Sequence, residues 1–88
     1  MLSEYPTATE LKEVAKQHLD LEITRADSIT AGNCTSGTDD FIERSLNGRT
    51  SVKVSELVSY IDDYIGIQTV LTYKFRQLEQ QAEEKSEE

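Results

Sequence analysis

Apolar residues recur at steps of three and four positions in several stretches of the chain, and this spacing is typical of helices that bury one face. The first stretch follows Thr7 and Glu10, whose separation is that of an N-terminal capping box. We therefore predict a first helix that starts at Ala8 and ends between Asp20 and Arg25.

A second, shorter helix is predicted around the next group of apolar residues. Ser36 or Thr38 would cap its start, because hydroxyl side chains accept hydrogen bonds from the free N–H groups of a first turn. Asn47 and Gly48 would end it, since both residues tolerate the left-handed backbone found after a helix. Its apolar side consists of Phe41, Ile42 and Leu46.

Two short segments alternate between apolar and polar residues, as half-buried strands do. Residues 21–24 either continue the first helix or form an extended segment, and residues 50–54 carry valines at alternate positions. A strand without a partner leaves its backbone hydrogen-bonding groups unpaired. Because no convincing second strand accompanies residues 50–54, we interpret them as an extended connector whose valines contact the core.

The last third of the chain again has helical spacing. Ser55 would cap a third helix, and a fourth would run from Ile67 to about Gln81. Gly66 either separates these two helices or lies within one long helix, at a cost of about 1 kcal/mol relative to alanine. The fourth helix carries an apolar seam close to heptad spacing: Ile67, Val70, Leu71, Phe75, Leu78 and Ala82.

Together these segments predict an all-α fold, a small domain of three or four helices with a structured, glycine-rich loop between the first and second helices. A chain of 88 residues is too short for two separate cores. We expect residues 1–6 to be a flexible lead-in and residues 7–82 to form the single domain. Residues 83–88 contain no apolar residue and are expected to be a disordered acidic tail.

Charge narrows the classes of function. The chain has 17 acidic and 9 basic residues, a formal net charge of −8, and the acidic excess is spread along its whole length. This argues against direct nucleic-acid binding, which requires clustered Lys and Arg. The single cysteine forms no internal disulfide, and there is neither a signal-peptide pattern nor a membrane-spanning apolar run. We therefore expect a cytoplasmic protein without membrane contact.

The segment between the first two predicted helices holds the candidate loop site. Its glycines, hydroxyls and N–H groups have the composition of an anion cradle at a helix start, but Asp39 and Asp40 would repel an anion. The interpretation we favour is a sharp corner between two helices, and a substitution of Gly37 would be strained if that residue had a positive φ. The candidate residues are Gly32, Asn33, Cys34, Ser36, Gly37 and Thr38.

A thiol-dependent enzyme or redox site at Cys34 is an alternative. A thiolate at a helix N-terminus has a lowered pKa and is a nucleophile, and His18 is the one histidine available as its base. Free cysteines are among the most buried residues, so we expect a buried structural thiol instead. Asp39/Asp40 and Asp62/Asp63 are adjacent residues that diverge on a helix, so no metal site and no cofactor are expected.

The last two predicted helices carry aromatic and arginine residues of the kind that anchor protein interfaces. The candidate surface consists of Tyr60, Tyr64, Tyr73, Phe75 and Arg76. We therefore predict a non-catalytic regulatory or adaptor module that binds a protein partner or self-associates through its C-terminal helices. An acidic inhibitor or nucleic-acid mimic is the other alternative, because the chain is acidic throughout.

Overall fold

The computed structural model describes the backbone of residues 6–86 and the side chains of residues 6–81. The elements follow in the order α1 (Ala8–Ala15), β1 (Glu22–Thr24), α2 (Arg25–Thr30), α3 (Thr35–Ser45), β2 (Ser51–Lys53), α4 (Val54–Leu57), a 3-10 helix η1 (Val58–Tyr60) and α5 (Ile65–Ser86). The fold is mostly helical, as predicted. The all-α expectation nevertheless missed a small two-stranded sheet.

The sheet corrects the interpretation of residues 50–54 as an unpaired connector. β1 and β2 are antiparallel, with Ile23 opposite Val52 and Thr24 opposite Ser51. The pairing extends past both strands, because the N–H of Arg25 donates to the carbonyl of Thr50 at 2.9 Å. Ile23 and Val52 are both buried. The alternation of apolar and polar residues in the two segments therefore reflects a sheet with one buried face.

Helix α1 begins as predicted and ends early. The Thr7 hydroxyl accepts a hydrogen bond from the Glu10 N–H at 3.1 Å, which confirms the predicted cap. The helix stops at Ala15, well before residue 20, and the chain then turns into β1. The alternating pattern at residues 21–24 therefore marked a strand and not the end of the helix.

Along the chain, helices α2 and α3 come between the two strands, and a four-residue turn joins them. Sequence reasoning missed α2, although Thr24 and Asp27 form a capping box at its start. Helix α3 begins at Thr35 with Cys34 as its N-cap, so neither Ser36 nor Thr38 has that role. Positive φ values at Asn47 and Gly48 confirm the predicted end of this helix.

The segment predicted as the third helix is broken into shorter elements. Helix α4 starts at Val54 without a cap from Ser55, spans four residues and passes into η1. Helix α5 then begins at Ile65, so Gly66 falls within its first turn and does not separate two helices. Its bounds include the predicted seam from Ile67 onwards.

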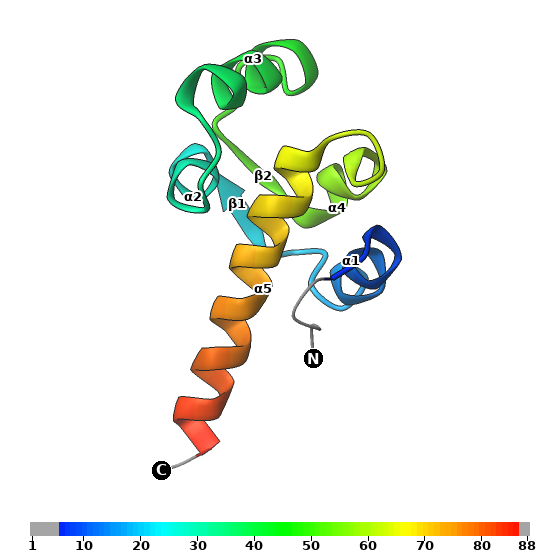
Figure 1. Ribbon diagram of the computed structural model, residues 1–88, viewed down its shortest axis with the longest axis vertical. Coiled ribbons are helices and arrows are strands. Elements are labelled where there is room, and N and C mark those ends of the chain that lie inside the picture. The colour runs from blue at the N-terminus through cyan, green and yellow to red at the C-terminus, as the bar shows by residue number, and fades with distance from the viewer. Residues whose placement is uncertain (1–5, 87–88) are drawn as a thin grey trace.

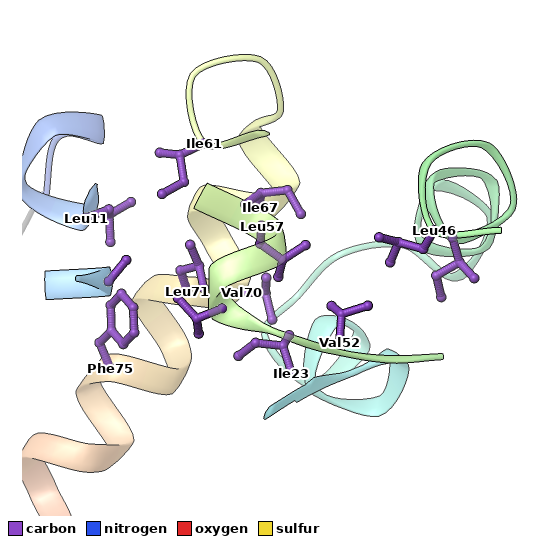
Figure 2. Packing of buried hydrophobic residues seen from close by; sticks show 13 residues of the cluster. Leu11, Ile23, Leu46, Val52, Leu57, Ile61, Ile67, Val70, Leu71 and Phe75 are labelled. Carbon is purple, nitrogen blue, oxygen red and sulfur yellow. The ribbon is translucent and has the colours of Figure 1, made fainter. Parts of the chain in front are cut away.

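The core lies where α5 crosses the sheet, α1 and α4 (Figure 1). Figure 2 shows the side chains of Phe75, Leu71 and Leu11 packed at one end of this cluster. Leu78 still packs against the core. The C-terminal part of α5 then runs clear of the other elements in Figure 1, and the helix reaches residue 86. Residues 83–86, which were expected to belong to a disordered acidic tail, are thus part of α5. Residues 1–5, 87 and 88 lie outside the described part, and the division into lead-in, domain and tail stays a prediction.

Candidate functional site

The turn between α2 and α3 is built by Gly32 and Asn33. Gly32 has a φ of 113°, a backbone conformation that favours glycine, whereas Gly37 lies inside α3 and has no positive φ. The condition of a positive φ at Gly37 is therefore not met, and left-handed strain is no reason for glycine at this position. Gly37 has a different role: a Cβ atom there would lie 3.0 Å from the Cys34 Sγ atom, so glycine leaves room for the thiol.

Asn33 joins this turn to the start of α5. Its Nδ2 group donates hydrogen bonds to the Ser28 Oγ atom and to the Gly66 carbonyl, each at 2.9 Å. The Ser28 hydroxyl also bonds to the hydroxyl of Thr38, a residue that is itself buried. Two predicted loop residues, Asn33 and Thr38, thus belong to one polar network that holds α2, α3 and α5 together.

Cys34 is exposed, which corrects the expectation of a buried thiol. Its Sγ atom accepts a hydrogen bond from the Gly37 N–H at 3.3 Å and contacts the Ser36 hydroxyl at 3.8 Å. These two hydrogen bonds, that of Gly37 first, lower the pKa of the Cys34 thiol. The position combines a lowered pKa with access to solvent, the two properties of a reactive thiol.

The thiol has no histidine beside it in the described structure. The imidazole of His18 packs against the Phe75 ring, with 5.8 Å between ring centroids, next to the core. The hydrogen bonds of Cys34 are made instead within the first turn of α3. The arrangement provides a nucleophile but does not bring the predicted base to it.

We expect Cys34 to react with iodoacetamide with an apparent pKa below the usual value of about 8.5. The measurement is the alkylation rate of the native protein against pH. Ser36→Ala removes one of the two hydrogen bonds and should raise the apparent pKa of Cys34 toward its usual value. The rise should be partial, because the backbone N–H of Gly37 still stabilises the thiolate. An apparent pKa at or above the usual value in the native protein would contradict the hydrogen-bonded position of Cys34.

A cavity of about 290 Å³ lies between α3 and the body of the protein, and sequence reasoning did not predict it. In Figure 2, Leu46, which directly follows α3, stands apart from Val52, Ile23 and the α5 side chains. The cavity reaches the surface at its exposed lining residues, which include Cys34 and Tyr64. Its apolar wall includes Ile23, Ile42, Leu46, Val52, Ile67 and Val70.

Four of the six predicted loop residues line this cavity: Asn33, Cys34, Gly37 and Thr38. Gly32 and Ser36 are outside its lining. The cavity is open to solvent at its exposed lining residues, so its apolar wall contacts water when it is unoccupied. Covering that apolar surface with the body of a ligand is favourable, at about 25 cal/mol per Å².

The predicted interaction surface is divided among three places. Phe75 is 1% exposed and belongs to the core, so it is not available to a partner. Tyr60 and Tyr64 pack against Phe41 of α3, with ring centroids 5.2 and 5.0 Å from the Phe41 centroid. Tyr73 and Arg76 lie on the outward side of α5 and line a groove there that also includes Pro6 and Ala31.

The outward side of α5 forms a stripe of helical spacing that was present in the sequence and was not recognised. Its members are Ile65, Thr69, Thr72, Tyr73, Arg76 and Gln80, all of which line the groove. Ile65 is 81% exposed, the most exposed large apolar residue in the described part. No Asp or Glu is among the described residues that line the groove, although the chain contains 17 acidic residues.

Many carboxylates of the described surface are engaged with cations. Asp27 contacts Lys74 at 3.3 Å, and Arg25 holds Asp39 at 2.6 Å. The hydrogen bond from Arg25 lowers the pKa of Asp39, and that from Arg49 lowers the pKa of Glu56. A further pair, Lys12 and Asp62, joins α1 to the segment before α5. Nothing in this arrangement specifically favours the acidic-mimic alternative.

Comparisons with protein-family models, curated proteins and solved structures gave no match to this chain. Within the described residues, no three or more His, Cys, Asp and Glu side chains gather in a way that would hold a metal ion. None of the described helices combines the length and apolar content needed to cross a membrane. Functional proposals therefore rest on the geometry of α5 and of the cavity.

Proposed function

We propose that this protein is a non-catalytic regulatory or adaptor module of the cytoplasm that acts through protein–protein contact. The contact is made by the outward stripe of α5, and the first partner is a second copy of the chain. The observation that carries the proposal is this acid-free stripe on an otherwise acidic protein. Two strongly acidic copies repel each other least where neither presents a carboxylate.

The stripe has the length and chemistry of a helix–helix contact. From Ile65 to Gln80 it spans about 22 Å at about 1.5 Å per residue. The Thr69 hydroxyl donates to the Ile65 carbonyl at 3.1 Å, and the Thr72 hydroxyl to the Gln68 carbonyl at 2.7 Å. Both hydroxyls are therefore satisfied within the helix, and these small residues permit the close approach of another backbone.

A symmetric pair places the twofold axis at the middle of the stripe, between Thr72 and Tyr73. Isologous contacts require each residue to face its counterpart across that axis, so two antiparallel α5 helices would bring Ile65 near the partner's Gln80. Tyr73 then lies near the centre of the contact, where tyrosine side chains contribute most to binding. The Gln77 Nε2 group donates to the Tyr73 hydroxyl at 2.7 Å and fixes the orientation of this ring.

We expect the protein to dimerise reversibly, and Thr72→Glu to raise the dissociation constant at least about tenfold, the equivalent of about 1.4 kcal/mol. The substitution places two carboxylates beside each other at the twofold axis, while glutamate is a better helix former than threonine. Sedimentation equilibrium from micromolar to sub-millimolar concentration measures the effect.

Ser59→Glu is the matched control, because it adds the same charge at an exposed position of η1, outside the stripe. It should dimerise like the wild type. A wild type that remains monomeric over the whole concentration range would contradict self-association. Equal dimerisation of Thr72→Glu and Ser59→Glu would move the contact to another surface.

A further inference from the structure

We propose that the cavity between α3 and the sheet binds a small organic acid that has an apolar body and one carboxylate, held by Arg25 and Arg49. This site goes beyond the proposed function, because it lies away from the outward stripe of α5 and needs no partner protein.

The apolar body of the ligand is defined by the walls. Branched aliphatic side chains from the sheet, α3 and α5 surround the space, among them Ile23, Ile42 and Val70. The volume of about 290 Å³ is roughly twice that of an apolar cavity of about 150 Å³ that holds benzene. The walls therefore suit a body of about two rings or a medium acyl chain, and water would find few hydrogen-bonding partners there.

The carboxylate of the ligand is indicated by the charges at the cavity. Arg25 and Arg49 line it, and no Asp or Glu is among the described lining residues. A guanidinium group offers a planar fork that matches a carboxylate. Both arginines are also paired with carboxylates outside the lining, Asp39 and Glu56. The lining therefore offers an anionic head group guanidinium donors and no carboxylate of its own, even though the chain carries a net charge of −8.

The sheet brings the two arginines to the same end of the cavity. Arg25 directly follows β1, and Arg49 comes shortly before β2. The strands are antiparallel, and the Arg25 N–H donates to the Thr50 carbonyl at 2.9 Å. The residue after β1 and the residues before β2 therefore lie at the same end of the sheet, and the two arginines are among them. This juxtaposition was hidden in the sequence, where 23 residues separate them.

Each arginine is already oriented by a carboxylate and keeps donor capacity. Arg25 uses Nε and Nη2 to bond to Asp39, at 2.6 and 3.2 Å. The Nη2 group of Arg49 contacts Glu56 at 2.8 Å, and its Nε group donates to the Leu46 carbonyl at 3.3 Å. The described hydrogen bonds leave the Nη1 group of both residues for a ligand. Asp39 and Glu56 hold the side chains and are not among the residues that line the cavity.

The test is calorimetric titration of the full chain with octanoate, and with octanol and octylammonium as matched probes of the same chain length. We expect one octanoate to bind per chain, octanol to bind at least about tenfold more weakly, and octylammonium not to bind. Equal affinity for octanoate and octanol, or the absence of octanoate binding at millimolar concentration, would overturn the proposal.

Two arginine variants separate a specific contact from general electrostatics. Arg49→Gln should weaken octanoate binding about tenfold and leave octanol binding unchanged. Arg44→Gln is its control, since Arg44 is an exposed arginine of α3 that pairs with Asp40 and does not line the cavity. It should bind octanoate like the wild type. An equal loss in both variants would overturn the role of Arg49.

The position of the ligand is tested on the wild type, without any risk to folding. In carbon–proton correlation spectra, octanoate should shift the methyl signals of Ile23, Val52 and Val70, which line the cavity. Leu11 and Ile61 are equally buried but lie outside the lining, so their signals should stay in place. Octanoate should also slow the alkylation of Cys34 at the cavity mouth. Shifts confined to residues outside the lining would overturn the assignment.

Discussion

Phe75→Ala is expected to lower the free energy of unfolding by about 3–5 kcal/mol. The Phe75 side chain is 1% exposed, and its ring packs against the imidazole of His18 at a centroid distance of 5.8 Å. Removing it leaves a cavity where α5 meets α1. Because a domain of this size has a total stability of about 5–15 kcal/mol, the variant should melt far below the wild type in thermal and urea unfolding.

Gln81→Ala is the control for this experiment. It introduces the same residue into the same helix at an exposed position outside the stripe, so its effect should stay within about 0.5 kcal/mol. If Phe75→Ala were as stable as this control but no longer dimerised, the ring would belong to an interface and the described core would be wrong.

Asn33→Ala is expected to cost about 1–3 kcal/mol, since two hydrogen bonds of a half-buried side chain are lost. Asn33→Asp should be less stable still at neutral pH, because it places a carboxylate against the Gly66 carbonyl. Protonation restores a donor, so the difference between the two variants should shrink as the pH falls. Urea unfolding of both variants at neutral and acidic pH measures these effects.

A double-mutant cycle with Ser28→Ala divides the effect between the two hydrogen bonds. The coupling free energy between Asn33 and Ser28 reports the hydrogen bond to the Ser28 hydroxyl. The part of the Asn33→Ala effect that is left after this coupling is subtracted reports the hydrogen bond to the Gly66 carbonyl. Asn33→Ala with unchanged stability would show that the turn is not fastened to α5.

The parts of the fold that sequence reasoning predicted depend on neighbouring residues. The Thr7 cap of α1 and the left-handed end of α3 at Asn47 are set within three or four positions, and both are present. The buried stripe of α5 follows from helical period alone. The burial of Phe75 agrees with its place in the predicted seam and contradicts its assignment to the predicted interaction surface.

The sheet could not be recognised in the same way, because each strand is three residues long and its partner is far along the chain. The capping box of Thr24 and Asp27 was a local signal for α2 that was not used. At the candidate site, four of the six predicted loop residues line one cavity, and their function stays a prediction. Their common cavity was not predictable, since its volume depends on how far α3 stands from β2 and α5.

The sheet has a consequence for how the molecule opens. Residues 25–50 leave the body at Thr24 and return at Ser51, two residues that face each other across the strands. A segment that departs and returns at one point can open as a unit, because its ends do not move apart. Its opening would break the hydrogen bond from Asn33 to the Gly66 carbonyl and withdraw Ile42 and Leu46 from the core. We expect residues 25–50 to form a subglobal unfolding unit whose opening has this cost, while the packing of α1 against α5 remains. The lifetime of a molecule held in the cavity would then be set by the frequency of this partial unfolding and not by global stability.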